Sequence, residues 1–442
     1  MVRSVLLFGQ LFDFLADPGA EGVAGAYRHV VAGALWIVDG RIAGHGPRET
    51  VLARIPAETR AVTAQYDYGA RLILPGFVDS HCHYPQATVL ASPGKDLLDW
   101  LARSIFPAEA ALADPEIAAR RADYFLDRLL AHGTTTASVF ATVHAHSVDA
   151  FMAAAEKRHL RMLCGKVMMD RCAVSALCDA PDTSERDCLG LIERWHGRER
   201  LRYSVTPRFA PTSSPDQLAL AGALLRSRPD LHLQSHLAEN TAELAAVARL
   251  YPERRDYLDV YAHYDLLGPR TIYGHGIHLS PRETDELAAT GTALAHCPSS
   301  NLFLGSGFFP LAERCAAGIP VGLGSDVGAG TSFSMLRTLH AAYLVAQTRG
   351  RPLAPWQGWY LATLGGARAL GLADYIGNFL PGKEADCVVL DPLALPELAM
   401  RLEHTDDLAD TLFALMLLGD ERCVHAVHIL GQPVLGNALA RA

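Results

Sequence analysis

The sequence is poor in lysine, has no paired cysteine motif and contains no apolar run long enough to span a membrane. Only four of its 442 residues are lysine, so arginine carries nearly all the positive charge, and the formal net charge is −9. This balance leaves no basic surplus to neutralise phosphates, which argues against sequence-independent binding of nucleic acid. The lack of an unbroken apolar run of about 20 residues excludes a membrane-spanning helix and a membrane partner.

The nine cysteines form no Cys-x-x-Cys pair and no regular framework. An odd number in a long chain is typical of reduced thiols, so we expect a cytoplasmic protein rather than a disulfide scaffold. The apolar opening MVRSVLLFGQLFDFL is interrupted by polar and acidic residues, and no small-residue cleavage site follows it. It is therefore predicted to be a first strand and not a signal peptide.

From residue 71 onward, short apolar runs alternate with longer amphipathic ones. The eight predicted strands are Leu72–Asp79, Thr134–Phe140, Arg161–Met168, Leu201–Pro207, Leu231–His236, Thr271–His275, Thr292–His296 and Val321–Ser325. The helices predicted between them are Pro115–His132, Ser147–His159, Pro215–Arg228, Thr241–Tyr251, Pro281–Thr290 and Phe309–Gly318. Eight strands alternating with helices predict an α/β fold, a (β/α)8 TIM barrel.

The two ends of the chain differ from this middle. Residues 1–70 contain short alternating runs such as His29–Val38, followed by Asp39-Gly40, a hairpin-type turn signal. Residues 380–442 repeat that pattern. We therefore predict a catalytic barrel over residues 71–379 and one small β-sandwich domain formed by the N-terminal and C-terminal segments together.

The most informative motif, LPGFVDSHCH, ends the first predicted barrel strand with two histidines one residue apart. Side chains at positions i and i+2 of a strand project from the same face, so His81 and His83 can bind one divalent metal together. Alone the pair is weak, because 19 histidines produce some such pairs by chance. Its meaning depends on whether further ligands follow later strands.

Polar residues do follow three later strands, at the carboxyl ends where barrel enzymes place their chemistry. His236 ends the fifth strand with Glu239 three residues beyond it, His275 ends the sixth, and Asp326 follows the eighth. Each has a structural alternative: a hydrogen-bonded core histidine, a turn cap for the aspartate, or a helix-start carboxylate for the glutamate. The metal site would be absent only if every one of these residues had its structural role instead. The residues taken together therefore predict a metal centre.

The predicted ligand set points to hydrolysis. The metal ligands are expected to be His81, His83, His236 and Asp326. Three imidazoles and a carboxylate suit Zn2+, or Fe2+, and leave a position for water, whose pKa the metal lowers from about 15.7 toward 7. Glu239 is placed to act as a general acid/base that moves protons to the substrate, while His275 and Asp326 hold the water and accept its proton. This apparatus favours hydroxide attack on an sp2 carbon.

Several motifs together resemble the metal-dependent amidohydrolase superfamily. They are PGFVDSHCH, the histidines ending strands five and six, GSD at 324–326 and PGKEADCVVLD at 381–391. Six further segments more narrowly resemble the guanine deaminase family: HYPQ (83–86), LLDWL (97–101), TPRFAPTSSPDQL (206–218), SHLAEN (235–240), GHGIHLS (274–280) and HCPSSNLFLGSGFFP (296–310). The resemblance implies hydrolysis of guanine to xanthine and ammonia in purine catabolism, one catalytic zinc per chain, and a homodimer.

The substrate is then expected to be a small purine base. Arg208 is similar to that family's purine-contacting arginine, and a guanidinium fork can donate to O6 and N7 of guanine. Phe209 offers an apolar or stacking wall, and Gln86 both donates and accepts along a purine edge. The expected substrate contacts shared with the metal centre are His236, Glu239, His275 and Asp326. The residues alone leave two structural alternatives open: Arg208 could pair with a carboxylate, and Phe209 could belong to the core. Segments 97–100 and 303–309 are expected to close the pocket.

Two other enzymatic interpretations stay open. A binuclear hydrolase would use Lys166, in the third predicted strand, as a carboxylated bridge between two metals, although Glu239 favours the single-metal mechanism. A deaminase of 8-oxoguanine, a triazine, cytosine or a nucleoside would reuse the same ligands, although Arg208-Phe209 and HYPQ favour guanine. A non-enzymatic scaffold requires a lost ligand, yet every expected position is filled.

Overall fold

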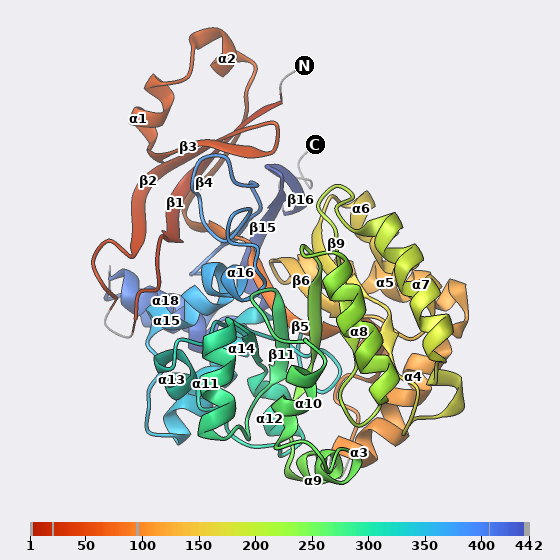
Figure 1. The fold of residues 1–442 in the computed structure, drawn as a ribbon. Coiled ribbons are helices and arrows are strands. Elements are labelled where there is room, and N and C mark those ends of the chain that lie inside the picture. Colours follow the sequence, from red (N-terminus) through yellow and green to blue (C-terminus); the bar gives the residue numbers. More distant parts are fainter. Residues whose placement is uncertain (1–2, 20–21, 94–96, 406, 437–442) are drawn as a thin grey trace.

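The computed structural model describes residues 3–19, 22–93, 97–405 and 407–436. They form a barrel of strands surrounded by helices, with a smaller mixed sheet beside it (Figure 1). Among these residues, no helix has both the length and the apolar character needed to cross a membrane.

The barrel sheet contains eight parallel strands that follow one another in chain order. They are β5 (Phe77–His83), β6 (Thr134–Phe140), β7 (Arg161–Gly165), β9 (Arg202–Pro207), β10 (His232–Leu237), β11 (Thr271–His275), β12 (Ala293–His296) and β13 (Val321–Leu323). The first and last strands meet where the Asp326 N–H donates to the His81 carbonyl, at 2.9 Å. The predicted (β/α)8 barrel is confirmed.

The first predicted strand, Leu72–Asp79, spans two real strands. Its first half belongs to β4 (Ala64–Pro75) of the small sheet, and the barrel strand β5 starts at Phe77 and continues through both histidines. Gly76 separates them, and a Cβ at that position would lie 2.1 Å from Oγ1 of Thr135. The third predicted strand is also divided, because β7 ends at Gly165 and the short β8 (Val167–Met168) pairs with β9.

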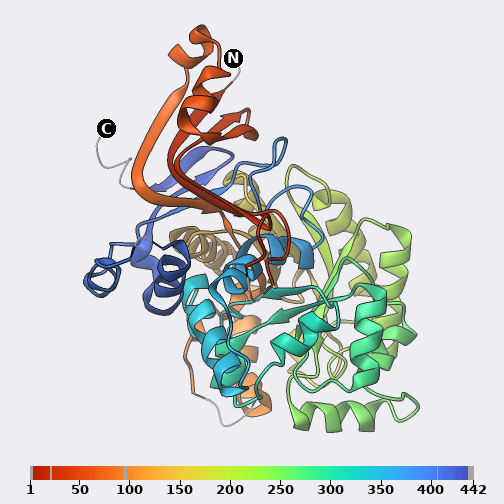
Figure 2. The same cartoon turned by 90° about the vertical axis from the view of Figure 1, so that its left-hand side faces the viewer.

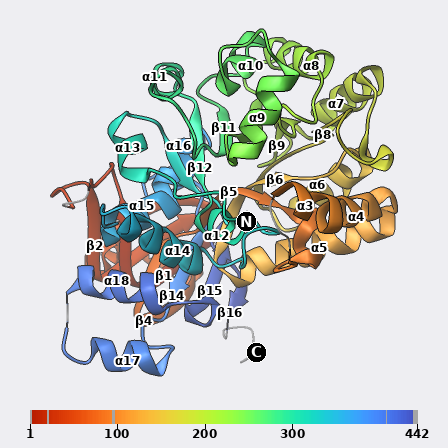
Figure 3. The same cartoon turned by 90° about the horizontal axis from the view of Figure 1, so that it is seen from below.

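Helices cover the outside of the barrel (Figures 1 and 3). They include α5 (Pro115–Ala131), α6 (Ala145–Lys157), α7 (Pro181–Trp195), α8 (Pro215–Ser227), α9 (Thr241–Leu250), α10 (Tyr257–His263), α11 (Pro281–Thr290), α12 (Pro298–Phe303), α13 (Leu311–Ala316), α14 (Met335–Thr348), α15 (Pro355–Tyr360) and α16 (Gly366–Ala369). The six predicted helices are present, and Asp114, Ser214 and Ser280 cap three of them with side-chain oxygens. Two further helices, α7 and α14, complete the alternation of strand and helix.

Both ends of the chain contribute to the second sheet. Its strand order is β16 (Gln432–Gly436), β15 (Val424–Ile429), β14 (Cys387–Leu390), β4, β1 (Ser4–Phe14), β2 (Tyr27–Val38) and β3 (Arg41–Pro47). The N-terminal strands project from the barrel (Figure 2), with α1 (Arg48–Ala53) and α2 (Ala57–Ala61) at their far end. The C-terminal segment adds α17 (Pro396–Leu402) and α18 (Leu408–Leu418), and α18 packs against α14, α15 and α17. The domain division at residue 71 stays a prediction, since β4 runs through it.

A buried ionic cluster joins the small sheet to the barrel. Glu384 accepts hydrogen bonds from Nε of Arg161 at 2.7 Å and Nε of Arg200 at 3.0 Å. Arg200 also donates from Nη1 to Asp386 at 3.1 Å. Arg161 begins β7 and Arg200 lies just before β9, at the end of the barrel opposite the histidines. Separating the small sheet from this end would leave buried charges without partners, which is unfavourable, so the cluster holds the two together.

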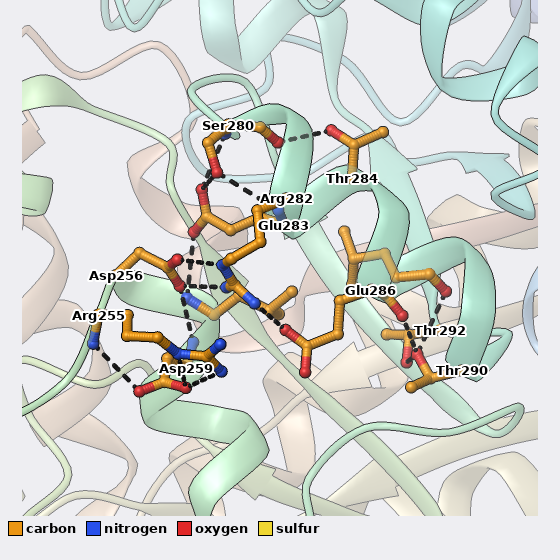
Figure 4. Close-up of polar contacts among 12 residues, drawn as sticks. Arg255, Asp256, Asp259, Ser280, Arg282, Glu283, Thr284, Glu286, Thr290 and Thr292 are labelled. Atoms are coloured by element: carbon orange, nitrogen blue, oxygen red, sulfur yellow. Dashed lines mark hydrogen bonds and ion pairs between the residues drawn. The ribbon is translucent and has the colours of Figure 1, made fainter.

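Ion pairs also hold α10 against α11 (Figure 4). Nε of Arg282 donates to Asp256 at 2.6 Å, just before α10 begins. Glu283, which is buried, accepts the N–H of Leu258 at 3.2 Å while it completes the capping box of α11. These contacts tie the chain that follows β10 to the chain that follows β11, and those two strands end near the predicted catalytic residues.

Candidate active site

Three histidine side chains meet at the carboxyl end of the barrel strands. His81 and His83 come from β5, and His236 comes from β10. Nε2 of His83 lies 3.3 Å from Nε2 of His81 and 3.2 Å from Nε2 of His236. Oδ1 of Asp326 lies 3.4 Å from Nε2 of His81 and from Nε2 of His83. Nε2 of His83 therefore lies within 3.4 Å of the other three donor atoms, which come from β5, β10 and the loop after β13.

The protonation of these groups suits a divalent cation. Burial lowers the pKa of all three histidines, because a low-dielectric interior disfavours the imidazolium form. Nδ1 of His236 donates to the carbonyl of Arg208 at 2.7 Å, which leaves its Nε2 lone pair free for a ligand. The pKa of Asp326 lies well below its usual value: burial alone would raise it, but hydrogen bonding and charge from His81 and its neighbours outweigh burial. Neutral imidazoles and one carboxylate are a donor set that fits a metal ion.

The backbone is shaped to bring these groups together. His275 at the end of β11 and Asp326 beyond β13 have φ angles of +72° and +48°, in the left-handed region that non-glycine residues rarely adopt. Such conformations persist only where the surrounding structure enforces them. At Gly274, a Cβ would lie 2.6 Å from Cε1 of His81, so glycine is what allows that ring to take its place.

Glu239 lies beside the cluster, on the loop that follows β10. Its Oε2 is 3.5 Å from Nε2 of His275, and its Oε1 accepts a hydrogen bond from the Ser306 hydroxyl at 2.8 Å. Burial raises the pKa of Glu239. The pKa of His275 is raised because the charges of Glu239 and Asp326 outweigh its burial, and its Nδ1 lies 2.8 Å from Oδ1 of Asn301. An acid/base carboxylate is thus held beside His275, in the pocket that His83, His236 and Asp326 also line.

One pocket is lined by every predicted site residue except His81, whose ring nitrogen lies 3.3 Å from that of His83. The pocket is lined by His83, Gln86, Trp100, Leu101, Arg208, Phe209, His236, Glu239, His275, Leu304, Asp326 and Ala329. Trp100 and Leu304 come from the segments expected to close it, and Leu101 directly follows the first of these segments. The side chains of Leu97 and Leu98, part of that expectation, lie outside the described residues.

Sequence reasoning missed two side chains that hold the site together. Ser306 bonds the Glu239 carboxylate, and Glu109, buried in α4 (Phe106–Ala110), pairs with Arg208 at 2.7 Å. Both roles considered for Arg208 are therefore compatible, since it lines the pocket and also pairs with a carboxylate. The only sequence signal for Glu109 was a single acidic residue within the otherwise uncharged run FPAEA.

Lys166, the residue that a binuclear site would require, binds other side chains. Its ammonium forms an ion pair with Asp179 and lies 3.4 Å from the Ser184 hydroxyl, and none of the contacts described for it involves a candidate metal ligand. This arrangement argues against a lysine bridge between two metals. Cys82, between the two β5 histidines, is buried with its thiol 3.6 Å from the Ser138 carbonyl, as expected for a packing residue.

An eight-stranded barrel with three histidines and an aspartate converging at its carboxyl end defines a metal-dependent hydrolase. Residues 72–434 match the Amidohydrolase family, and the chain belongs to this metal-dependent family. The predicted superfamily is therefore confirmed.

Individual relatives narrow the comparison. The chain is 46% identical to the guanine deaminase of Escherichia coli over 414 residues, which cover 94% of this chain and 93% of that protein. The solved structure of E. coli guanine deaminase superposes with a TM-score of 0.95 at 44% identity, covering 98% of this chain and 99% of that one. Guanine deaminase from C. acetobutylicum with guanine bound in its active site superposes with a TM-score of 0.87 at 27% identity, covering 98% and 100%.

Proposed function

We propose that the protein is a guanine deaminase that converts guanine and water into xanthine and ammonia. A C–O bond forms and the C–N bond to the exocyclic amine breaks at the amino-bearing ring carbon. The observation that carries the proposal is the position of Glu239, whose carboxylate lies 3.5 Å from His275 in the pocket that also holds the histidine cluster and Arg208. The similarity to E. coli guanine deaminase over nearly the whole chain supports the same substrate.

The metal is proposed to be one zinc ion per chain. The residues that would hold it are His81, His83, His236 and Asp326, whose donor atoms already converge. When bound, it would supply a Lewis acid that lowers the pKa of a coordinated water toward about 7. Imidazole and carboxylate donors in this number suit zinc, and ferrous iron is the second candidate.

Proton transfer is assigned to Glu239. Burial raises its pKa, which brings the carboxyl closer to the range in which it can both accept and release a proton near neutral pH. The Ser306 hydroxyl occupies Oε1 and leaves Oε2 facing His275, so one oxygen is fixed while the other is available for transfer. Glu239 would take one proton from water and deliver it to a ring nitrogen, while His275 and Asp326 orient the water. Glu239 would then take the second proton from the new C–OH group, which becomes a carbonyl, and pass it to the amine as the C–N bond breaks.

Purine recognition is assigned to three side chains on one side of the pocket. The Arg208 guanidinium and the Gln86 amide would donate to and accept from the polar edge of the base. Phe209 is buried, and its ring centroid lies 6.3 Å from that of His236. It would form an apolar wall against the planar purine ring. Trp100 and Leu304 would exclude bulk water from above, which strengthens the polar contacts.

A cytoplasmic homodimer acting in purine catabolism completes the proposal. All nine cysteines are free thiols, and six of them are buried, which suits a reducing compartment. Phe303, Phe308 and Leu344 expose apolar surface that a second copy of the chain would cover.

The proposal is tested by incubating the zinc-loaded protein with guanine in water enriched in oxygen-18. It expects one ammonia released for each xanthine formed, and one labelled oxygen in each xanthine molecule. Absence of ammonia from the zinc-loaded protein would reject the function. Release of ammonia without label in xanthine would reject the hydrolytic route.

A further inference from the structure

Glu109 does not line the pocket, but it contacts Arg208 and Gln86, two of the polar residues that do. Its side chain is 1% exposed. The Arg208 Nη1 atom lies 2.8 Å from Oε1 and 2.7 Å from Oε2 of Glu109. The Gln86 Nε2 atom donates to Oε1 at 2.9 Å. Arg208 and Gln86 line the pocket, whereas Glu109 does not, so its influence on a ligand passes through these two residues.

These bonds determine how Gln86 presents its amide. A carboxylate only accepts hydrogen bonds, so it holds the NH2 group of Gln86 and directs the carbonyl oxygen the other way. That oxygen is accommodated beside Gly328, where a Cβ would lie 2.0 Å from Oε1 of Gln86 and where φ is +127°. The acceptor and donor of Gln86 are therefore not interchangeable, and Glu109 sets their order.

Glu109 also balances the charge of the pocket wall. The guanidinium of Arg208 is buried, so without a partner it would place an uncompensated positive charge against the substrate. Guanine is neutral. Its deamination product has a second carbonyl in place of the amino group, which makes a ring N–H of xanthine more acidic and the molecule more readily anionic. An unpaired Arg208 would thus favour product over substrate.

We propose that Glu109 is a positioning residue that orients Arg208 and Gln86 and neutralises Arg208, so that the pocket prefers a neutral purine over its acidic product. This inference rests on the proposed function of the same site. It assigns Glu109 no contact with the reacting atoms.

The first test is Glu109→Gln, which keeps the shape but removes the charge and one acceptor. Loss of a charge-assisted hydrogen bond network corresponds to about a tenfold change. We expect KM for guanine to rise about tenfold with a smaller change in kcat, unchanged zinc content, and tighter inhibition by xanthine, more so at alkaline pH. Glu313→Gln, which breaks the surface pair with Arg349, is the matched control and should behave as the parent protein.

The second test shows whether Glu109 acts through Arg208. Arg208→Met and the double variant Arg208→Met/Glu109→Gln are compared, since the double variant leaves no buried charge unpaired and folds even if Glu109→Gln alone does not. In the Arg208→Met background, adding Glu109→Gln should no longer tighten inhibition by xanthine, and it should raise KM for guanine by less than in the parent protein, because only the orientation of Gln86 is then lost. Additive losses, or a fall in kcat and zinc content with KM and xanthine inhibition unchanged, would overturn the proposal.

The parent protein separates this inference from the proposed function. If the zinc-loaded parent releases no ammonia from guanine, the function itself fails. If the parent is active and Glu109→Gln binds guanine and xanthine in the parent's ratio, only the role of Glu109 fails.

Discussion

The Ser306 hydroxyl donates a hydrogen bond of 2.8 Å to Oε1 of Glu239, although the two residues are 67 positions apart in the chain. Ser306 lies on the loop beyond α12, and Glu239 lies on the loop beyond β10. The loop that helps to close the pocket therefore also touches the proposed acid/base.

Ser306→Ala should shift the pH dependence of the reaction. Burial raises the pKa of Glu239 and the Ser306 bond opposes that rise, so its removal should raise the pKa further. Glu239 must be ionised to accept a proton from water. The acid limb of kcat/KM for guanine should therefore move to higher pH, by about one unit for the loss of one bond to a charged group. An acid limb that stays in place, or moves to lower pH, would contradict this assignment.

Glu239→Gln should keep the metal and lose most of the turnover. Gln has nearly the same shape but cannot accept and release a proton, and general acid/base catalysis contributes about 10²- to 10⁴-fold. Zinc content by elemental analysis and kcat for guanine are measured on the same preparation. Retention of near-native kcat would make the acid/base assignment wrong, and Glu313→Gln serves again as the control for a lost surface charge.

Removal of the metal should abolish activity and lower thermal stability together. A ligand that binds only the folded protein stabilises it by RT ln(1 + [L]/Kd), about 4 kcal/mol at a concentration 1,000 times Kd. Dialysis against a chelator should therefore lower the melting midpoint, and one equivalent of zinc per chain should restore both the midpoint and ammonia release. A requirement for two equivalents would support the binuclear alternative.

His428 should make the small sheet sensitive to acid. Burial lowers its pKa to about 4, and its Nε2 lies 2.6 Å from the Tyr68 hydroxyl. Between pH 6.5 and about 4 the unfolded chain binds a proton that the folded chain refuses, so stability is complete above pH 6.5 and falls by about 3 kcal/mol toward pH 4.

Thermal midpoints at pH 7 and pH 5 test this linkage. The fall between these two values should be smaller in His428→Gln than in the parent protein, whereas His404→Gln, at an exposed position, should match the parent. Equal falls in all three proteins would show that His428 does not control the acid sensitivity.

The barrel and its polar strand ends were predictable because both follow from local pattern. Alternating apolar and amphipathic runs reveal the strands, and a histidine or aspartate at the end of an apolar strand stands out against its neighbours. Residues 72–79 were predicted as one strand, but they belong to two. The end of β4 and the start of β5 form one continuous apolar run, and only Gly76, which lies close to Thr135, separates them.

Glu109 and Ser306 were not predictable for a different reason. Their partners are 99 and 67 residues away in the chain, and neither lies at the end of a barrel strand. A single sequence reports what a segment prefers locally, but not which buried carboxylate will meet which guanidinium. The pairing of α4 with the end of β9 is a tertiary property that only the folded structure contains.

The central claim is that this pocket is built for guanine. The most direct measurement is kcat/KM for ammonia release by the zinc-loaded protein from guanine, 8-oxoguanine, adenine, cytosine and triazines, compared under one set of conditions. The account predicts that guanine is used with the highest kcat/KM, within the range of about 10⁴ to 10⁸ M⁻¹s⁻¹ that is usual for enzymes acting on their own substrates. A higher kcat/KM for any other member of this panel would contradict it.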